Sequence, residues 1–391
     1  MKTFVATLAT GFCLATSSFL HAEDPEPVET WRRFDGTIGK DLGITLYLSE
    51  NTDHDGGTML SGTYHYHRSG LPIDLDVERV EQSERLKLRE AKWDAANARD
   101  IVTGLWDATL KDKTIAGTWN SPDGKKNLPV HLVENYPKGS MPLRIIRLHM
   151  ANTMQRDTQR TGYERTLSYP QVVGKGKVVD RLNETLRQKV LSFFADEDGK
   201  RSKHHASATV ADIERQMFAP PEEAVEFDGD FNYVDTSNHE AHIVTNGDGF
   251  LTVEFEHSSY SGGAHGNFGF DYLVLDLTTG DPVELENQVV KGFEKHWVEL
   301  GAAALREQAG VGPKAPLSDA GLFEDKLELN ENWYLMPGGI GYSYDPYEIG
   351  PYAAGQISFN LEWKDIAADL KPGSALSDFA SRFAKKAPTK P

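Results

Sequence analysis

The sequence predicts a mostly β protein: a β-rich N-terminal module, built as an antiparallel meander or open barrel, followed by an α+β domain with an antiparallel sheet and two main helices. Three observations support this fold class. Short segments in the first third of the chain alternate apolar and polar residues and are separated by turn residues. One later segment, 177–194, repeats apolar residues at the period of a helix, and a second helix is expected at 289–308. Between the two parts lies a stretch with two prolines and a Gly-Ser pair, which is typical of a linker.

These features divide the 391 residues into six segments. We expect a signal peptide at 1–22, an acidic linker at 23–30, the β-rich module at 31–136, a linker at 137–142, the α+β domain at 143–378 and a disordered basic tail at 379–391.

The first segment has the three parts of a secretory signal. Lys2 is followed by an uncharged run from Phe4 to Leu20, and Ala22 stands directly before an acidic, proline-bearing stretch. Cleavage is therefore expected after Ala22, which predicts a periplasmic or secreted protein. The run is short for a bilayer crossing, which takes about 20 apolar residues, so no stable membrane insertion is expected. An uncleaved anchor is the alternative.

Charge and cysteine content narrow the classes of partner. The chain has 59 acidic and 41 basic residues, for a formal net charge of −18, and loss of Lys2 makes the mature protein one unit more negative. This balance disfavours nucleic acid and anionic lipid, and it favours solubility or a basic partner. The only cysteine, Cys13, leaves with the signal, so we expect no disulfide, thiol nucleophile or cysteine-bound zinc. No cofactor is predicted.

In the N-terminal module the alternating pattern predicts short strands. Ser121–Gly124, with proline second and glycine fourth, is a predicted β-turn between two of them. The predicted strands lie at 44–48, 59–67, 86–88, 104–110, 115–119 and 128–133.

In the second domain we expect strands and two helices. Val178, Leu182, Leu186 and Val190 recur at helical spacing within the first helix. The predicted helices are 177–194 and 289–308, and the predicted strands are 145–150, 161–169, 239–244, 250–258, 268–276, 333–336, 341–344 and 356–360.

Two motifs of the second domain carry the candidate site residues. The first contains Tyr260, Ser261, Gly262, Gly263 and His265 between two predicted strands. Its adjacent glycines allow positive φ and close approach of the backbone, and turn N–H groups can form an anion-binding concavity. A hydrolase could use Ser261 and His265, but the nucleophile elbow requires a strand-to-helix turn. A histidine that stabilises the turn, or a turn that contacts a ligand, is therefore favoured.

The second motif, Tyr344 to Gly355, contains three tyrosines and two prolines. Each residue before a proline is biased toward an extended backbone, so the loop is expected to be stiff. It would present tyrosine rings, chiefly Tyr347 and Tyr352, and the carboxylate of Glu348 to a protein or sugar. Alternatively the rings cover the sheet edge and Glu348 caps a backbone group.

Together these motifs resemble the extracytoplasmic domain of lysozyme-sensing anti-sigma factors of Gram-positive bacteria, which also occurs beside peptidoglycan deacetylase domains. The shared pattern is Ser-Gly-Gly-Ala-His, an apolar strand ending in Thr-Gly, a helical stretch, and Pro-Tyr-Glu-Ile-x-Pro-Tyr-Ala-x-Gly, in that order. The resemblance covers about residues 143–370 and implies recognition of an envelope component, which is lysozyme itself in the sensing members. We expect no transmembrane helix and no cytoplasmic sigma-binding segment, so signalling does not carry over. The sequence also lacks the zinc motifs of a polysaccharide deacetylase, so deacetylation does not carry over either.

The leading interpretation is therefore an exported, non-enzymatic binding protein whose partner is a lysozyme-like protein or a peptidoglycan fragment. The alternatives are a hydrolase of envelope glycan or peptide acting through Ser261 and His265, and a structural module of an envelope complex. His65 and His67 face the same side of a strand, and His54 is nearby, but no complete metal site can be placed, so none is predicted.

Overall fold

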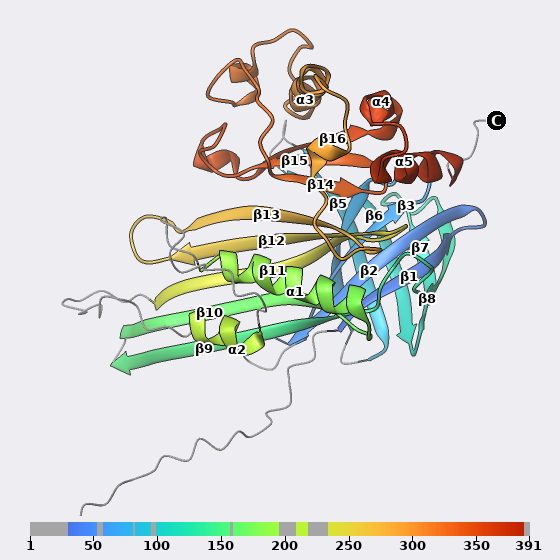
Figure 1. The fold of residues 1–391 in the computed structure, drawn as a ribbon. Helices are drawn as coiled ribbons and strands as arrows, with labels where there is room; N and C mark the ends of the chain where they lie inside the picture. Colours follow the sequence, from blue (N-terminus) through green and yellow to red (C-terminus); the bar gives the residue numbers. More distant parts are fainter. Residues whose placement is uncertain are drawn as a thin grey trace, which may run out of the picture.

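The computed structural model describes residues 30–52, 58–80, 83–94, 99–156, 159–194, 209–217 and 234–386. The predicted signal peptide and all of the predicted acidic linker except Thr30 lie outside these ranges. The described chain forms three β units in sequence order, namely a closed barrel, a five-stranded sheet and a three-stranded sheet (Figure 1). The predicted fold class, a β-rich module followed by an α+β region, is confirmed. No helix of the described residues is long and apolar enough to cross a membrane.

The barrel contains eight strands, each paired antiparallel with the next. The first strand also pairs with the last, through Phe34 opposite Glu134, so the meander is closed rather than open. The turn predicted at Ser121–Gly124 is present, with the Gly124 N–H donating to the Ser121 carbonyl at 2.8 Å. The strands are β1 Thr30–Ile38, β2 Leu42–Thr52, β3 Thr58–Tyr66, β4 Pro72–Arg79, β5 Arg85–Asp94, β6 Arg99–Lys111, β7 Thr114–Asn120 and β8 Asn127–Glu134.

Alternation along the strands fills the barrel with apolar side chains and one carboxylate. Glu90 is 3% exposed, and its Oε1 accepts hydrogen bonds from the Trp106 and Trp119 indoles, both at 2.6 Å, and from the Tyr64 hydroxyl at 2.9 Å. A buried carboxylate is tolerated only when donors replace water, and these three do so. A Cβ on Gly104 would lie 2.4 Å from both Glu90 Oε2 and Trp119 Nε1, so this position needs glycine.

The second unit is a five-stranded sheet in the order β13-β12-β11-β10-β9. We expected an antiparallel sheet, but β10 and β11 are parallel, so the sheet is mixed. The physical reason is the long connection between them, which holds two helices and returns the chain to the end where β10 began. The elements are β9 Leu143–Arg156, β10 Gln159–Val172, α1 Lys177–Ser192, α2 Val210–Met217, β11 Val234–Gly247, β12 Phe250–Tyr260 and β13 Asn267–Asp276.

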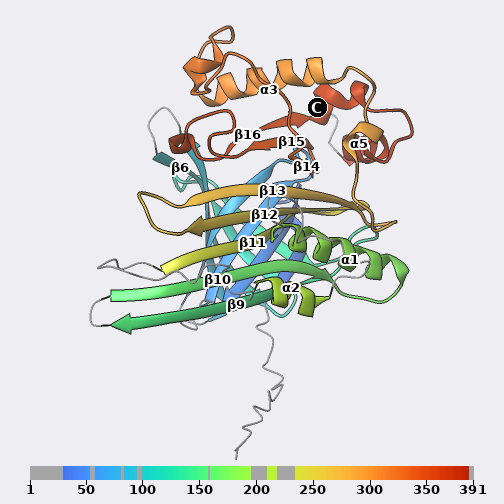
Figure 2. The ribbon, with the colours of Figure 1, turned by 60° about the vertical axis from the view of Figure 1, so that its left-hand side comes forward.

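Helix α1 confirms the periodicity found in the sequence. Leu182, Leu186 and Val190 are fully buried, and they pack on the core that also contains Leu167 and Phe255 of the sheet. Figure 2 shows α1 across one face of the sheet, over β10 and β11, with the barrel behind the opposite face. The sheet is therefore the central layer of the molecule.

The third unit packs a three-stranded sheet against several helices. The second predicted helix begins at Glu294 rather than at 289, because Val289 forms a β-bridge with Leu370. The elements are η1 Leu285–Asn287, α3 Glu294–Gln308, η2 Leu317–Ala320, β14 Trp333–Met336, β15 Gly339–Tyr344, η3 Tyr352–Ala354, β16 Ile357–Glu362, α4 Trp363–Ile366, η4 Ala367–Asp369 and α5 Ala375–Lys386.

The predicted disordered tail is wrong for residues 379–386, because they belong to α5. Phe379 is 3% exposed and packs edge-on against Phe250 and Trp363, with ring centroids 5.2 and 6.0 Å away. Burial of this ring in the core fixes the helix. Residues 387–391 lie outside the described residues.

One buried residue joins the barrel, the linker and the central sheet. Asn246 of β11 is fully buried, and its side-chain amide exchanges two hydrogen bonds with the Met141 backbone, at 2.7 and 2.9 Å. Its backbone N–H donates to the Tyr47 hydroxyl at 3.1 Å, and its carbonyl accepts from Arg33 at 2.7 Å. All polar atoms of Asn246 are satisfied, so this contact orients the barrel against the sheet.

Candidate functional site

The first motif is the turn between β12 and β13. Gly262 and Gly263 have φ of 96° and 95°, the left-handed region that favours glycine, as expected from the sequence. The Tyr260 hydroxyl donates to the Gly263 carbonyl at 3.1 Å, and the His265 Nδ1–H donates to the Gly266 carbonyl at 2.8 Å. The histidine therefore stabilises the turn while its ring remains exposed.

The second motif is the loop between β15 and β16. Glu348 closes it, accepting from the Asp345 N–H at 3.0 Å and from the Asn330 side-chain amide at 2.8 Å. This is the backbone-capping role that we considered as an alternative for Glu348. Tyr347 has φ of 72°, which is rare for a residue with a side chain, and it is 58% exposed. The loop thus holds an aromatic ring out to solvent on a strained backbone.

The two motifs meet through Tyr352. Its ring stacks on His265 with centroids 4.1 Å apart and an interplanar angle of 26°, and its hydroxyl donates to the Gly266 carbonyl at 2.7 Å. The centroid of the Tyr347 ring lies 5.7 Å from that of the Tyr352 ring. We call Tyr260, His265, Tyr347 and Tyr352 the tyrosine–histidine surface.

Ser261 and His265 are close in sequence but do not form a nucleophile–base pair. Ser261 is exposed, and no hydrogen bond joins it to His265 in the described structure. Since His265 Nδ1 donates to a backbone carbonyl, the ring has no carboxylate that would orient it as a base. The geometry therefore favours a turn-stabilising role for His265.

Several titratable side chains lie on or against strands β11 to β13. Asp345 accepts from the Phe270 N–H at 2.8 Å, and burial raises the pKa of its carboxyl. Asp271 pairs with Lys189 of α1 at 2.8 Å, and its other oxygen lies 3.8 Å from His257 Nδ1. His239 is stacked on Phe193 at 5.3 Å, and burial, with a smaller effect of His257, lowers the pKa of His239 to about 4.

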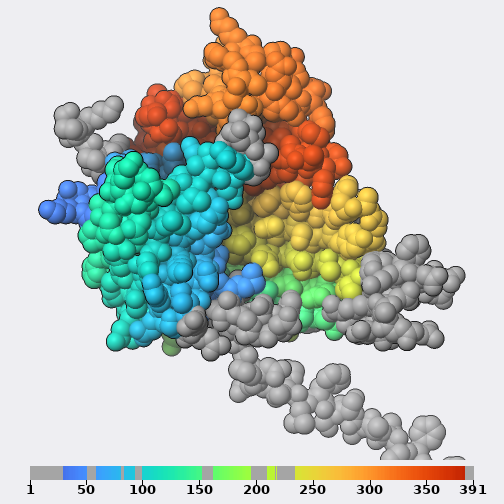
Figure 3. Space-filling model, turned by 180° about the vertical axis from the view of Figure 1, so that it is seen from behind, coloured from blue at the N-terminus to red at the C-terminus, as the bar shows by residue number. Residues whose placement is uncertain are grey.

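A groove of about 340 Å³ separates the barrel from the central sheet. Figure 3 shows this hollow between the barrel and strands β11 and β12. Glu254 and His242 line it from the sheet, and Asp74 and Thr63 from the barrel. The Tyr272 hydroxyl donates to Glu254, whose carboxyl pKa is raised chiefly by burial. None of these residues was singled out in the sequence.

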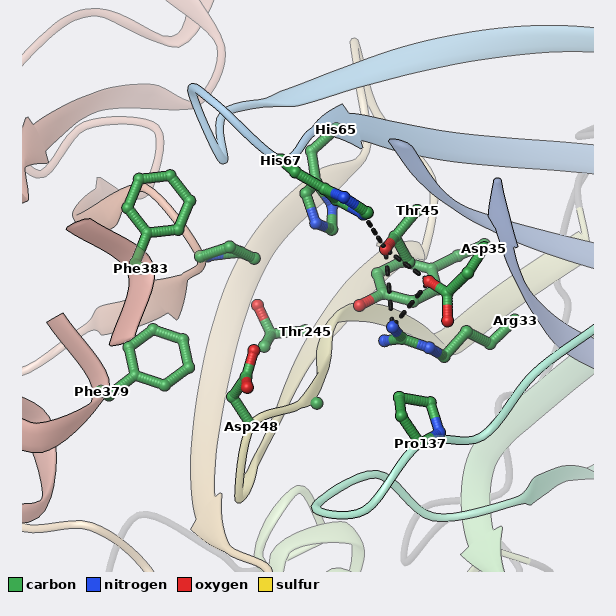
Figure 4. Close-up of a pocket in the computed structure, with 13 residues that line it drawn as sticks. Arg33, Asp35, Thr45, His65, His67, Pro137, Thr245, Asp248, Phe379 and Phe383 are labelled. Carbon is green, nitrogen blue, oxygen red and sulfur yellow. Dashed lines mark hydrogen bonds and ion pairs between the residues drawn. The ribbon is translucent and has the colours of Figure 1, made fainter. Parts of the chain in front are cut away.

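A second cavity of about 280 Å³ lies where all three units meet, and we call it the junction cavity (Figure 4). Its polar wall comes from adjacent barrel strands, where Asp35 opposes Thr45 and Thr45 opposes His65. The lining residues are Arg33, Asp35, Thr45, Tyr47, His65, His67, Pro137, Thr245, Gly247, Asp248, Pro337, Phe379 and Phe383.

The junction cavity was missed in the sequence, although a signal was present. Residues two apart on a strand point to the same side of it. Three such pairs lie on neighbouring strands or directly after one and all point out of the barrel, namely Arg33 and Asp35, Thr45 and Tyr47, and His65 and His67. Arg33, Thr45 and His65 are nonetheless buried, because the rest of the chain covers this face. The described residues contain no group of three histidine or acidic side chains placed to hold a metal ion.

Comparison with known proteins identifies two matches in the second part of the chain. Residues 158–268 match the family model of deacetylase PdaC, and residues 286–364 match that of a protein family of unknown function, DUF3298. The first match contains the Ser-Gly-Gly-Ala-His turn, and the second contains the tyrosine-rich loop. No curated protein matches this chain.

Solved structures of DUF3298 proteins are also similar. A member from Bacteroides fragilis is 18% identical, with a TM-score of 0.47, over 62% of this chain and the whole of that one. A family protein from Pseudomonas aeruginosa is 16% identical, with a TM-score of 0.44, over 59% of this chain and 95% of that one. The predicted resemblance to a domain that occurs beside deacetylase domains is confirmed by the family matches: residues 286–364 are similar to DUF3298, a family of unknown function, and residues 158–268 are similar to deacetylase PdaC.

Proposed function

We propose that this protein is an exported binding protein of the bacterial envelope and that its tyrosine–histidine surface recognises a basic, lysozyme-like protein. One observation carries the proposal. Two motifs about 80 residues apart in the chain are joined by the stacking of Tyr352 on His265 and by the Tyr352 hydroxyl bond to Gly266. Side chains needed only to close each loop would have no reason to stack across the two loops.

The chemistry of this surface suits protein recognition. Tyrosine provides a large contact area at a low cost in side-chain entropy, and tyrosine is enriched among the residues that dominate interface energies. Tyr347 is the most exposed ring, and its backbone conformation is already fixed before a partner arrives. Preorganisation of this kind lowers the entropic cost of binding.

Charge favours a basic partner. The formal net charge of −18 would attract a basic protein over distances near the Debye length, which is about 8 Å at physiological salt. Such steering mainly raises the association rate and weakens as salt increases. The expected complex is therefore salt-sensitive, with aromatic contacts at its centre.

Titration calorimetry of the full chain with purified lysozyme tests the proposal. We expect binding by the wild type and at least a tenfold weaker affinity for Tyr347→Ala, because loss of a central interface tyrosine costs about 1.4 kcal/mol or more. Leu105→Ala is the matched control, since Leu105 is 43% exposed on the barrel, and its affinity should equal that of the wild type.

Absence of binding by the folded wild type would contradict the proposal. Equal affinities of the wild type and Tyr347→Ala for lysozyme would show that the tyrosine–histidine surface is not the binding site. Muropeptides titrated in parallel test the other partner class, and binding of muropeptides without lysozyme would replace the protein partner by a glycan.

A further inference from the structure

The junction cavity has two chemically different walls. Hydrogen-bonding side chains of the barrel form one wall, and Phe379 and Phe383 of α5, one helical turn apart, form the other (Figure 4). Phe379 is anchored in the core, whereas Phe383 is half-buried. Small-molecule sites combine apolar walls with a few placed polar groups in this way.

The polar wall is a closed hydrogen-bond network at its centre. The Thr45 hydroxyl donates its single proton to Asp35 at 2.7 Å, so it must accept from His67 Nε2, which lies 3.0 Å away. Arg33 pairs with Asp35 at 2.7 Å, and the Asn135 amide donates to the second Asp35 oxygen at 2.9 Å. The Arg33 charge is thereby neutralised within the wall.

Two donors of the same wall make no hydrogen bond to an acceptor within the described residues. The Tyr47 hydroxyl accepts from the Asn246 N–H at 3.1 Å, and it donates no hydrogen bond to any of the described residues. Arg33 is 8% exposed, and its Nε–H is buried without a partner within the described parts of the chain. Buried donors without acceptors are costly, so the cavity is set up for a molecule that supplies a hydrogen-bond acceptor.

The charges that line the junction cavity indicate whether the bound acceptor is an anion or a neutral group. Arg33 is already paired with Asp35, so it has no unpaired positive charge to offer an anion. An ammonium group has donors only and could not satisfy Tyr47. A neutral carbonyl oxygen meets both conditions.

Volume sets the size of the apolar part. A cavity of about 150 Å³ holds benzene, and the junction cavity of about 280 Å³ is nearly twice as large. It has room for one ring against Phe383 and a short amide that reaches Tyr47.

We propose that the junction cavity binds a small neutral molecule, with its carbonyl oxygen toward Tyr47 and Arg33 and its apolar ring against Phe379 and Phe383. This is a second site of the protein. It shares no lining residue with the tyrosine–histidine surface.

Ligand-observed NMR on the full chain with acetanilide as the probe tests this site. We expect saturation transfer to acetanilide and a Kd on the order of 1 mM, as for other ligands of about ten atoms. Ethylbenzene lacks the acceptor, phenylacetate is an anion and benzylamine is a cation, so each should bind more weakly.

Two variants locate the bound probe. Tyr47→Phe removes the donor and should weaken acetanilide binding about tenfold. Phe383→Ala removes part of the apolar wall and should weaken acetanilide and ethylbenzene alike. Tyr344→Phe is the matched control, because it loses one buried hydroxyl bond, to the Glu328 carbonyl at 2.8 Å, outside the cavity.

The inference is overturned if acetanilide fails to bind, if it binds no better than ethylbenzene or phenylacetate, or if the folded Tyr47→Phe and Phe383→Ala variants both bind it like the wild type. Lysozyme titrations in the presence of acetanilide separate this outcome from the proposed function. They should be unchanged whether or not the cavity is occupied.

Discussion

At Tyr347 a side chain of the proposed binding surface occupies a left-handed backbone, which costs about 1–3 kcal/mol for a residue other than glycine. The loop offsets this cost locally, because the Tyr347 N–H donates to the Gly350 carbonyl at 3.0 Å and Glu348 closes the preceding turn. Strain of this kind is retained where the surroundings hold it and where orientation of the side chain matters. The exposed ring of Tyr347 is the part of the loop that gains from it.

His239 of β11, stacked on Phe193, links pH to stability. Its pKa of about 4 in the fold lies below the ordinary histidine value of 6.5, so between these values the unfolded chain binds a proton that the folded chain does not. Stability therefore rises with pH through this window and is lost as pH falls from 6.5 toward 4. We expect His239 to contribute a loss of about 2 kcal/mol, after discounting for the part of its ring that solvent reaches.

Urea unfolding at pH 7 and pH 4.5 measures this effect. His239→Phe keeps a ring against Phe193 but removes the titration, so this variant should lose less stability than the wild type. An equal loss in both proteins would show that His239 is not the group responsible.

The sequence predicts the backbone conformation of a single residue only where that residue or its immediate neighbours determine it. The positive φ of Gly262 and Gly263 follows from glycine itself, and the turn at Ser121–Gly124 follows from its proline and glycine. The conformation of Tyr347 depends on contacts within the folded loop. The stacking of Tyr352 on His265 depends on two distant segments meeting, and neither could be derived from composition.

Among the elements, α5 shows how a short helix escapes detection. Its lysines and its position near the end of the chain are typical of a solvated tail, but Leu376, Phe379 and Phe383 are spaced by three and four residues. That spacing places all three on one face of a helix. Strand β4 was missed for a similar reason, because Pro72 at its start obscured the alternation that follows.

Phe379→Ala tests whether α5 is part of the fold. Removing a fully packed phenylalanine leaves a cavity and should lower the free energy of unfolding by about 3–5 kcal/mol. Arg382→Ala, on the exposed face of the same helix, should change it by less than about 0.5 kcal/mol. Equal urea midpoints for Phe379→Ala and the wild type would contradict the packing of α5 in the core and would favour the disordered tail predicted from the sequence.

Helix α1 and the antiparallel strands were predictable because their periodicity reflects burial of one face. The parallel pairing of β10 with β11 was not, because alternation is the same in either direction. Only the length of the connection, with its helix, indicates a crossover. Pairing direction thus depends on topology rather than on the residues of the strands.

At the scale of the whole molecule, the two proposed binding sites lie where separate units of the fold meet. Asn246 fixes the barrel on the central sheet, α5 closes the junction cavity, and Tyr352 connects the two motifs. The sequence identified the motif residues and their family resemblance, but not the cavity. Its lining comes from segments that only the closed barrel and the third unit bring together.

Hydrogen exchange of the full chain with and without saturating lysozyme tests the central claim most directly. The claim is that 260–267 and 344–355 form one binding surface. We predict slower amide exchange in both segments at once, with Tyr347→Ala reducing protection in both. Unchanged exchange in both segments, or protection confined to other parts of the chain, would contradict it.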